Sequence, residues 1–151
     1  MNSRFCILLL LCTIIIWGNS SCTKSTEIKI SKHNETESHH NGRNCMDCHY
    51  SGNNNYAWVI AGSCYDTNFT KPYPNATIKF YTEANGGGLE IGSLEVDGKG
   101  NFYTTENINF KLGLYPVVIG TSGKKMSMHS TVTTGVCGSC HNYTTCKICV
   151  K

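Results

Sequence analysis

The stretch Asn75-Ala-Thr-Ile-Lys-Phe-Tyr-Thr-Glu83 decides the fold class, because apolar and polar residues alternate along it. Ala76, Ile78 and Phe80 fall on one face of an extended chain, and polar or amphipathic side chains fall on the other. This alternation is typical of a β-strand that buries one face, whereas an amphipathic helix would repeat about every 3.6 residues. The stretch therefore predicts a strand at residues 75–83.

Short apolar stretches separated by turn residues continue on both sides of this strand, and none of them has helical periodicity. The sequence Asp97-Gly-Lys-Gly100 is a strong tight-turn signal, and it predicts a hairpin between the strands that flank it. We therefore expect an all-β fold, an antiparallel β-sandwich of about seven strands. The clearest of these expected strands are 56–65, 75–83, 89–96, 101–105, 114–120 and 126–134.

Four segments between residues 61 and 123 carry a resemblance to a known family: Gly62-Ser-Cys-Tyr-Asp66, Pro72-Tyr-Pro-Asn-Ala-Thr-Ile-Lys-Phe80, Val96-Asp-Gly-Lys-Gly-Asn-Phe102 and Gly113-Leu-Tyr-Pro-Val-Val118. These segments resemble the prealbumin-like sandwich of carboxypeptidase regulatory-like domains. The resemblance implies that Phe102 and Tyr115 fill the core. It also implies that Cys64 stands where a small core aliphatic is usual, which favours a buried, inert thiol.

Two copies of one pentapeptide bracket the predicted sandwich: the front motif, Cys45-Met46-Asp47-Cys48-His49, and the back motif, Cys137-Gly138-Ser139-Cys140-His141. In Cys-x-x-Cys-His the two thiols are spaced to bond the vinyl groups of one porphyrin, and the histidine then binds its iron. Only 6 of the 151 residues are His, so a His after both pairs has a chance probability of about 10⁻³. The pattern predicts two covalently attached haem c groups, held by Cys45, Cys48 and His49 and by Cys137, Cys140 and His141.

The start of the chain predicts export. Arg4 precedes an apolar run at residues 5–17, and small and polar residues lead from there into Cys22. The run is shorter than the roughly 20 residues of a permanent membrane-spanning helix. Small residues directly before a cysteine resemble a bacterial lipobox, which implies lipid attachment at Cys22 and removal of residues 1–21. Asn19 departs from that pattern, and ordinary cleavage to a soluble exported protein is the alternative.

The predicted organisation is a signal peptide at 1–21, a flexible polar tether at 22–44, a dihaem β-sandwich domain at 45–141 and a cysteine-containing tail at 142–151. Among the charged residues, removal of the signal takes away Arg4 alone, which leaves 12 basic and 10 acidic groups. No basic stretch indicates a nucleic-acid partner. No Ser/His/Asp set, phosphate-binding glycine loop or carboxylate pair indicates an enzyme.

The order of export signal, haem motif, sandwich and haem motif resembles that of small dihaem c-type cytochrome lipoproteins of bacteria, over nearly the whole mature chain. This resemblance implies electron transfer rather than catalysis, a lipid anchor in the membrane, and redox protein partners in the cell envelope. Haem c is attached outside the cytoplasm, so the export signal and the haem motifs agree. Thr23 after Cys22 is not an acidic retention signal. We therefore expect the outer membrane, facing the periplasm or the cell surface.

A six-coordinate electron-transfer haem needs a second strong iron ligand, commonly His or Met. For the front motif we favour His39, with His40 second, because both lie just before it. For the back motif we favour Met128, with His129 second, partly because the dihaem family carries a methionine at about this offset. Met126 is a further candidate, although its alternation with Met128 also fits a strand with one packed face.

The tail pair Cys146 and Cys149 lacks a following histidine. In an exported protein it predicts a disulfide, either within the pair or to another thiol such as Cys64, and a degenerate third haem site is the alternative.

Two functional alternatives stay open beside electron transfer. One is a haem enzyme or gas sensor whose iron is open to small molecules. The other is a zinc-stabilised β-sandwich binding module whose ligands would be Cys45, Cys48, Cys137 and Cys140.

Overall fold

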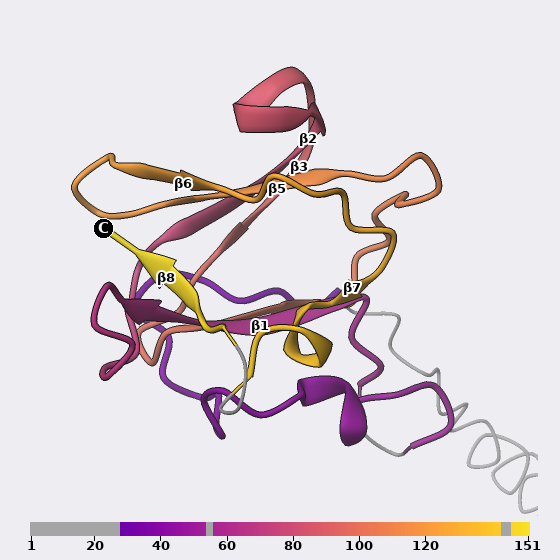
Figure 1. The fold of residues 1–151 in the computed structure, drawn as a ribbon. Coiled ribbons are helices and arrows are strands. Elements are labelled where there is room, and N and C mark those ends of the chain that lie inside the picture. The colour runs from indigo at the N-terminus through magenta and orange to yellow at the C-terminus, as the bar shows by residue number, and fades with distance from the viewer. Residues whose placement is uncertain (1–27, 54–55, 143–145) are drawn as a thin grey trace, which may run out of the picture.

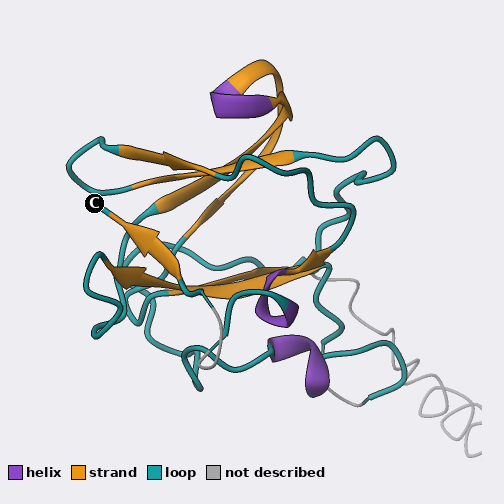
Figure 2. Ribbon diagram, viewed as in Figure 1, coloured by secondary structure: helices purple, strands orange, loops and turns teal. Residues whose placement is uncertain are grey.

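The computed structural model describes residues 28–53, 56–142 and 146–151. Within them two sheets pack face to face, as Figures 1 and 2 show, and the predicted all-β sandwich is confirmed. The first sheet contains β4 (Asn101–Thr104), β1 (Ile60–Asp66), β7 (Gly135–Val136) and β8 (Ile148–Val150). The second has the order β3 (Gly87–Glu95), β2 (Thr77–Glu83), β5 (Tyr115–Ile119) and β6 (Lys125–Ser127). The helical elements of this part of the chain are three short 3₁₀ turns, η1 (Cys45–Asp47), η2 (Ala84–Gly86) and η3 (Cys137–Ser139).

The buried core contains the apolar face that the alternating sequence at residues 75–83 predicts. Ala76, Ile78 and Phe80 are each at most 4% exposed, and β2 pairs antiparallel with both β3 and β5. Phe102 is buried in the same cluster, as expected. Tyr115 does not fill the core as predicted; it is half-buried, and its neighbour Leu114 takes the core position.

The turn at residues 97–100 forms, but the hairpin predicted across it does not. Oδ1 of Asp97 accepts hydrogen bonds of 2.9 Å from the backbone N–H groups of Lys99 and Asn101. Beyond the turn the strands separate, because β3 pairs with β2 in the second sheet while β4 pairs with β1 in the first. The turn therefore carries the chain from one sheet to the other.

The strand predicted at 126–134 is also divided between the sheets. β6 covers only its start, after which the Met128 N–H donates to the Pro116 carbonyl. The chain then crosses to β7, which pairs parallel with β1. Gly135 allows this pairing, since a Cβ there would collide with the Val59 carbonyl and the Ile60 backbone. The crossing delivers the back motif to the outer face of the first sheet (Figure 1).

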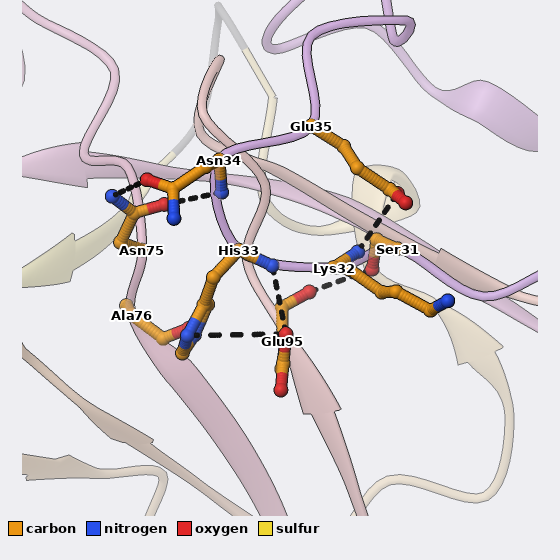
Figure 3. A network of polar contacts seen from close by, with 8 residues as sticks. All are labelled: Ser31, Lys32, His33, Asn34, Glu35, Asn75, Ala76 and Glu95. Atoms are coloured by element: carbon orange, nitrogen blue, oxygen red, sulfur yellow. Dashed lines mark hydrogen bonds and ion pairs between the residues drawn. The ribbon is translucent and has the colours of Figure 1, made fainter.

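Residues 28–44, here called the strap, do not form the predicted flexible tether. Ser31 is buried, and its hydroxyl donates to the Glu95 carbonyl at 2.6 Å (Figure 3). The His33 N–H donates to the Glu95 carboxylate at 2.7 Å, and the side chain of Asn34 pairs with that of Asn75. Several of the polar residues that made the segment look solvated thus form hydrogen bonds to the sandwich. Residues 22–27 of the predicted tether lie outside the described residues.

Candidate haem-binding site

Both Cys-x-x-Cys-His motifs fold into the same backbone turn. In the front motif the His49 N–H donates to the Cys45 carbonyl at 3.0 Å, and in the back motif the His141 N–H donates to the Cys137 carbonyl at 2.9 Å. The front turn is also capped by the side chain of Asn44, which accepts from the Met46 N–H, while the back turn has no side-chain cap. One local geometry therefore sets both candidate attachment sites.

The ring of each motif histidine is held by a backbone carbonyl. Nδ1 of His49 lies 3.1 Å from the Tyr56 oxygen, and Nδ1 of His141 is hydrogen-bonded to the Cys146 oxygen. A carbonyl can only accept, so Nδ1 must be the protonated nitrogen, which leaves a lone pair on Nε2 of the neutral ring. Metal-binding histidines are commonly oriented in this way. Neither partner can be recognised in the sequence, because every residue has a backbone carbonyl.

A cavity of about 830 Å³ lies beside the front motif, within the usual size range of cofactor pockets. Its lining combines the strap, the front motif and β4. Trp58 forms an aromatic wall, with its ring centre 4.8 Å from that of His49 and 4.7 Å from that of Tyr103. The residues most relevant to a haem there are His39, His40, Cys45, Cys48, His49, Tyr56, Trp58 and Tyr103.

The strap brings His39 to His49. Their ring centres are 6.0 Å apart, and His40 lies edge-on to His39 at 4.9 Å. His39, the first choice from the sequence as second ligand, is thus the histidine that the strap places beside His49.

The structure does not bring the back-motif candidates to His141. Met126 lies in β6 and packs against the core, and Met128 and His129 follow along the edge of the second sheet. The back motif instead lies on the outer face of the first sheet, where η3 packs against β1 (Figure 1). The first sheet lies between β6 and the back motif.

The front and back motifs are in direct contact, although residues 50–136 separate them in sequence. A Cβ on Gly138 would lie only 2.7 Å from the Asn44 Cα, so the two turns pack backbone to backbone. Asn142, which follows the back motif, donates to the Gly138 carbonyl at 3.2 Å and also lines the front cavity. Figure 1 shows η1 and η3 together beneath the first sheet. The two predicted haem sites therefore form one composite site.

The first cysteine of each motif faces inward, and the second is exposed. Burial raises the pKa of the Cys45 thiol and raises the pKa of Cys137 to about 12, where the neighbouring Cys45 adds to the effect. Cys48 and Cys140 are exposed to solvent. In both motifs, one thiol of the pair is therefore packed against the protein and the other is accessible to solvent.

The remaining cysteines of the described residues are free thiols, so the predicted tail disulfide is not formed. The tail instead adds β8 to β1, with Cys149 opposite Tyr65. Cys64 is fully buried, as expected, and burial raises the pKa of its thiol. Across residues 28–53, 56–142 and 146–151, no group of three or more His, Cys, Asp or Glu side chains is arranged to hold a metal ion. The four-cysteine zinc site is thus not assembled.

Lipid attachment was predicted at Cys22, which lies outside the described residues. In the part of the chain that the structure describes, no helix is long and apolar enough to cross a membrane. Comparisons of the chain with protein-family models, curated proteins and solved structures find no significant match.

Proposed function

We propose that this protein is a dihaem c-type cytochrome that transfers single electrons. The observation that carries the proposal is the way in which the two motif histidines are held. His49 and His141 each bind a backbone carbonyl through Nδ1, so in the neutral ring Nε2 is the nitrogen left to bind iron beside a Cys-x-x-Cys pair. Neither a redox dithiol nor a zinc-thiolate site requires a histidine prepared in this way.

The chain's own residues would bind, orient and shield the cofactors. Cys45 and Cys48 would hold one haem and Cys137 and Cys140 the other, with His49 and His141 as proximal ligands. The haem supplies reversible one-electron chemistry when bound. At the front site the wall of Trp58 and Tyr103 excludes water from one side of the cavity, and a drier site disfavours the more charged oxidised iron.

The contact between the motifs supports a function as a pair. Gly138 lets η3 approach Asn44 closely, and Asn142 reaches from the back motif into the front cavity. Two cofactors attached to touching backbone turns would be close neighbours, which favours passage of an electron from one to the other. The sandwich core thus acts as a rigid base that holds both sites on one face.

The proposal also includes where the protein acts and with which proteins it exchanges electrons. Export and lipid attachment at Cys22 would place the protein in the cell envelope, where haem c attachment takes place. Redox proteins of the envelope would then donate and accept the electrons.

A second candidate function follows from the back motif. Met128 and His129 directly follow β6 of the second sheet and so do not lie beside the back motif. An iron bound by His141 would then keep a position open to a small ligand. A gas sensor or a small haem enzyme would use such a position. Binding of carbon monoxide to one haem at full stoichiometry would favour this candidate over simple electron transfer.

The proposed function is tested by producing the full chain in bacteria that carry the haem-attachment machinery. The protein should retain its colour after denaturation and acid–acetone extraction, and its reduced pyridine-haemochrome spectrum should correspond to two haems per chain. Colourless protein, or metal bound without covalent haem, would overturn the proposal. A matched chain without residues 1–21, kept in the cytoplasm, should remain haem-free.

A further inference from the structure

Asn101 connects the strap to the sandwich at the point where the strap carries His39. It is the first residue of β4 and is 3% exposed. Its Nδ2 donates to the Ser38 hydroxyl at 2.8 Å and to the His39 carbonyl at 3.4 Å. Its Oδ1 accepts from the Ser63 hydroxyl at 2.6 Å and from the Asn41 amide at 3.0 Å. A single buried amide therefore binds the backbone or side chains on both sides of His39.

Neighbouring bonds hold the same part of the strap. The Lys99 ammonium donates to the Ser38 carbonyl at 2.8 Å, and the Asn41 amide donates to the Lys99 carbonyl at 2.6 Å. The Gly42 N–H donates to the Ser63 hydroxyl at 2.9 Å. The chain before and after His39 is thus fixed, and these anchors lie on β1, on β4 or in the turn that precedes β4.

The histidine rings themselves have no comparable support from hydrogen bonds in the described structure. His39 and His40 are exposed, and their aromatic contacts are with each other and with His49. The position of the His39 ring therefore depends on the backbone that carries it. A ligand held in place before its metal arrives loses less freedom on binding than one on a free segment.

We propose that Asn101 is the positioning residue for the distal iron ligand of the front haem. By fixing the strap at Ser38, His39 and Asn41, it keeps the His39 ring at 6.0 Å from the His49 ring. The inference rests on the proposed haem-binding function and adds to it the residue that positions the second iron ligand of the front site.

The test compares variants of the full haem-loaded chain by visible and electron paramagnetic resonance spectra. His39→Ala first identifies the low-spin signal of the front haem. Asn101→Ala should lose at least half of that same signal while keeping two haems per chain, and added imidazole should restore it. The second haem should be unchanged in both variants.

Two serine variants make a matched pair within the strap. Ser38→Ala removes the hydroxyl that Asn101 binds, whereas Ser31→Ala removes a hydroxyl at the other end of the strap, which is bonded to the backbone of Glu95 and Tyr103. Ser38→Ala should lose part of the front low-spin signal, and Ser31→Ala should keep all of it. In the haem-free chain, hydrogen exchange of the amides at 38–42 should accelerate in Asn101→Ala and Ser38→Ala only.

A wild-type low-spin spectrum in Asn101→Ala with both haems present would overturn the inference, as would equal losses in the two serine variants. If Asn101→Ala does not load two haems, the serine pair decides. If His39→Ala leaves the spectrum unchanged, the positioning role fails while the two-haem function stands. If the wild-type chain carries no covalent haem, the proposed function has failed.

Discussion

The front and back motifs share one backbone turn but differ in the segments that surround it. The front turn is capped by Asn44 and opens on a walled cavity that holds a second histidine, His39. The back turn lacks a side-chain cap, and His141 is held by the tail through the Cys146 carbonyl. In the proposed cytochrome, the pentapeptide would therefore determine haem attachment and the proximal ligand, while the surrounding chain would determine the distal ligand and the access of water.

The largest expected effect comes from removing either attachment site. Cys45→Ala/Cys48→Ala and Cys137→Ala/Cys140→Ala should each reduce the covalent haem from two to one per chain, because in the proposed function each pair would bond its own porphyrin. Intact-mass measurement of the denatured chains checks this. Cys146→Ala/Cys149→Ala is the control and should keep both haems; loss of a haem there would show that the tail pair takes part in attachment.

The second-largest effect is expected when the candidate distal ligands of the two motifs are replaced one at a time. His39→Ala should convert the front haem from low spin to high spin, because its ring lies 6.0 Å from that of His49. Met128→Ala should leave both haems unchanged, since Met128 lies along the second sheet. Reduced and oxidised visible spectra distinguish the two results. A spectral change in Met128→Ala would show that the back ligand reaches across, as the sequence alone suggested.

A smaller effect is expected where the two motifs touch. Gly138→Ala places a Cβ 2.7 Å from the Asn44 Cα, so the turns must separate. Such overpacking should lower the free energy of unfolding by about 1–3 kcal/mol and weaken the magnetic coupling between the haems. Denaturant unfolding and electron paramagnetic resonance measure these changes. Ser139→Ala in the same turn is the control, and equal effects in both variants would contradict a specific contact at Gly138.

The smallest effect concerns thiol protonation in the haem-free chain. Burial raises the pKa of Cys137 to about 12 from an ordinary value of 9.0. The folded state therefore holds its proton more tightly than the unfolded state, and this contribution to stability is complete below pH 9 and is lost as pH rises toward 12. Unfolding free energies measured across this range should fall less steeply in Cys137→Ser. An equal pH dependence in that variant would contradict the burial.

The rate of thiol modification also tests the difference between the inward-facing and the exposed cysteine of each motif. At pH 8 the exposed Cys48 and Cys140 should react with iodoacetamide several times faster than Cys45 and Cys137, whose pKa values are raised by burial. Peptide mass mapping of the haem-free chain gives the order. Equal rates for all four would mean that the inward-facing thiols are accessible.

Local patterns predicted the fold class well, because alternation at Ala76, Ile78 and Phe80 is a direct consequence of strand geometry. They did not predict which strands pair. The turn at 97–100 has the same chemistry in a hairpin and in a crossing between sheets, and only packing decides between them.

The candidate site shows the same difference between features that local sequence predicts and features that depend on packing. Spacing alone predicts the candidate attachment residues, whereas it does not predict that backbone carbonyls hold the rings of His49 and His141. The strap looked solvated because polar composition is the same for a free tether and for a segment whose polar groups are bonded. Its order depends on distant partners such as Glu95 and Asn101, which sequence spacing does not connect to residues 28–44.

The most direct test of the central claim is the intact mass of the denatured full chain after production with the haem-attachment machinery. We expect a mass increase of two haem groups in the wild type and of one haem group in each attachment variant. A wild-type chain with no added haem mass would contradict the proposed dihaem function.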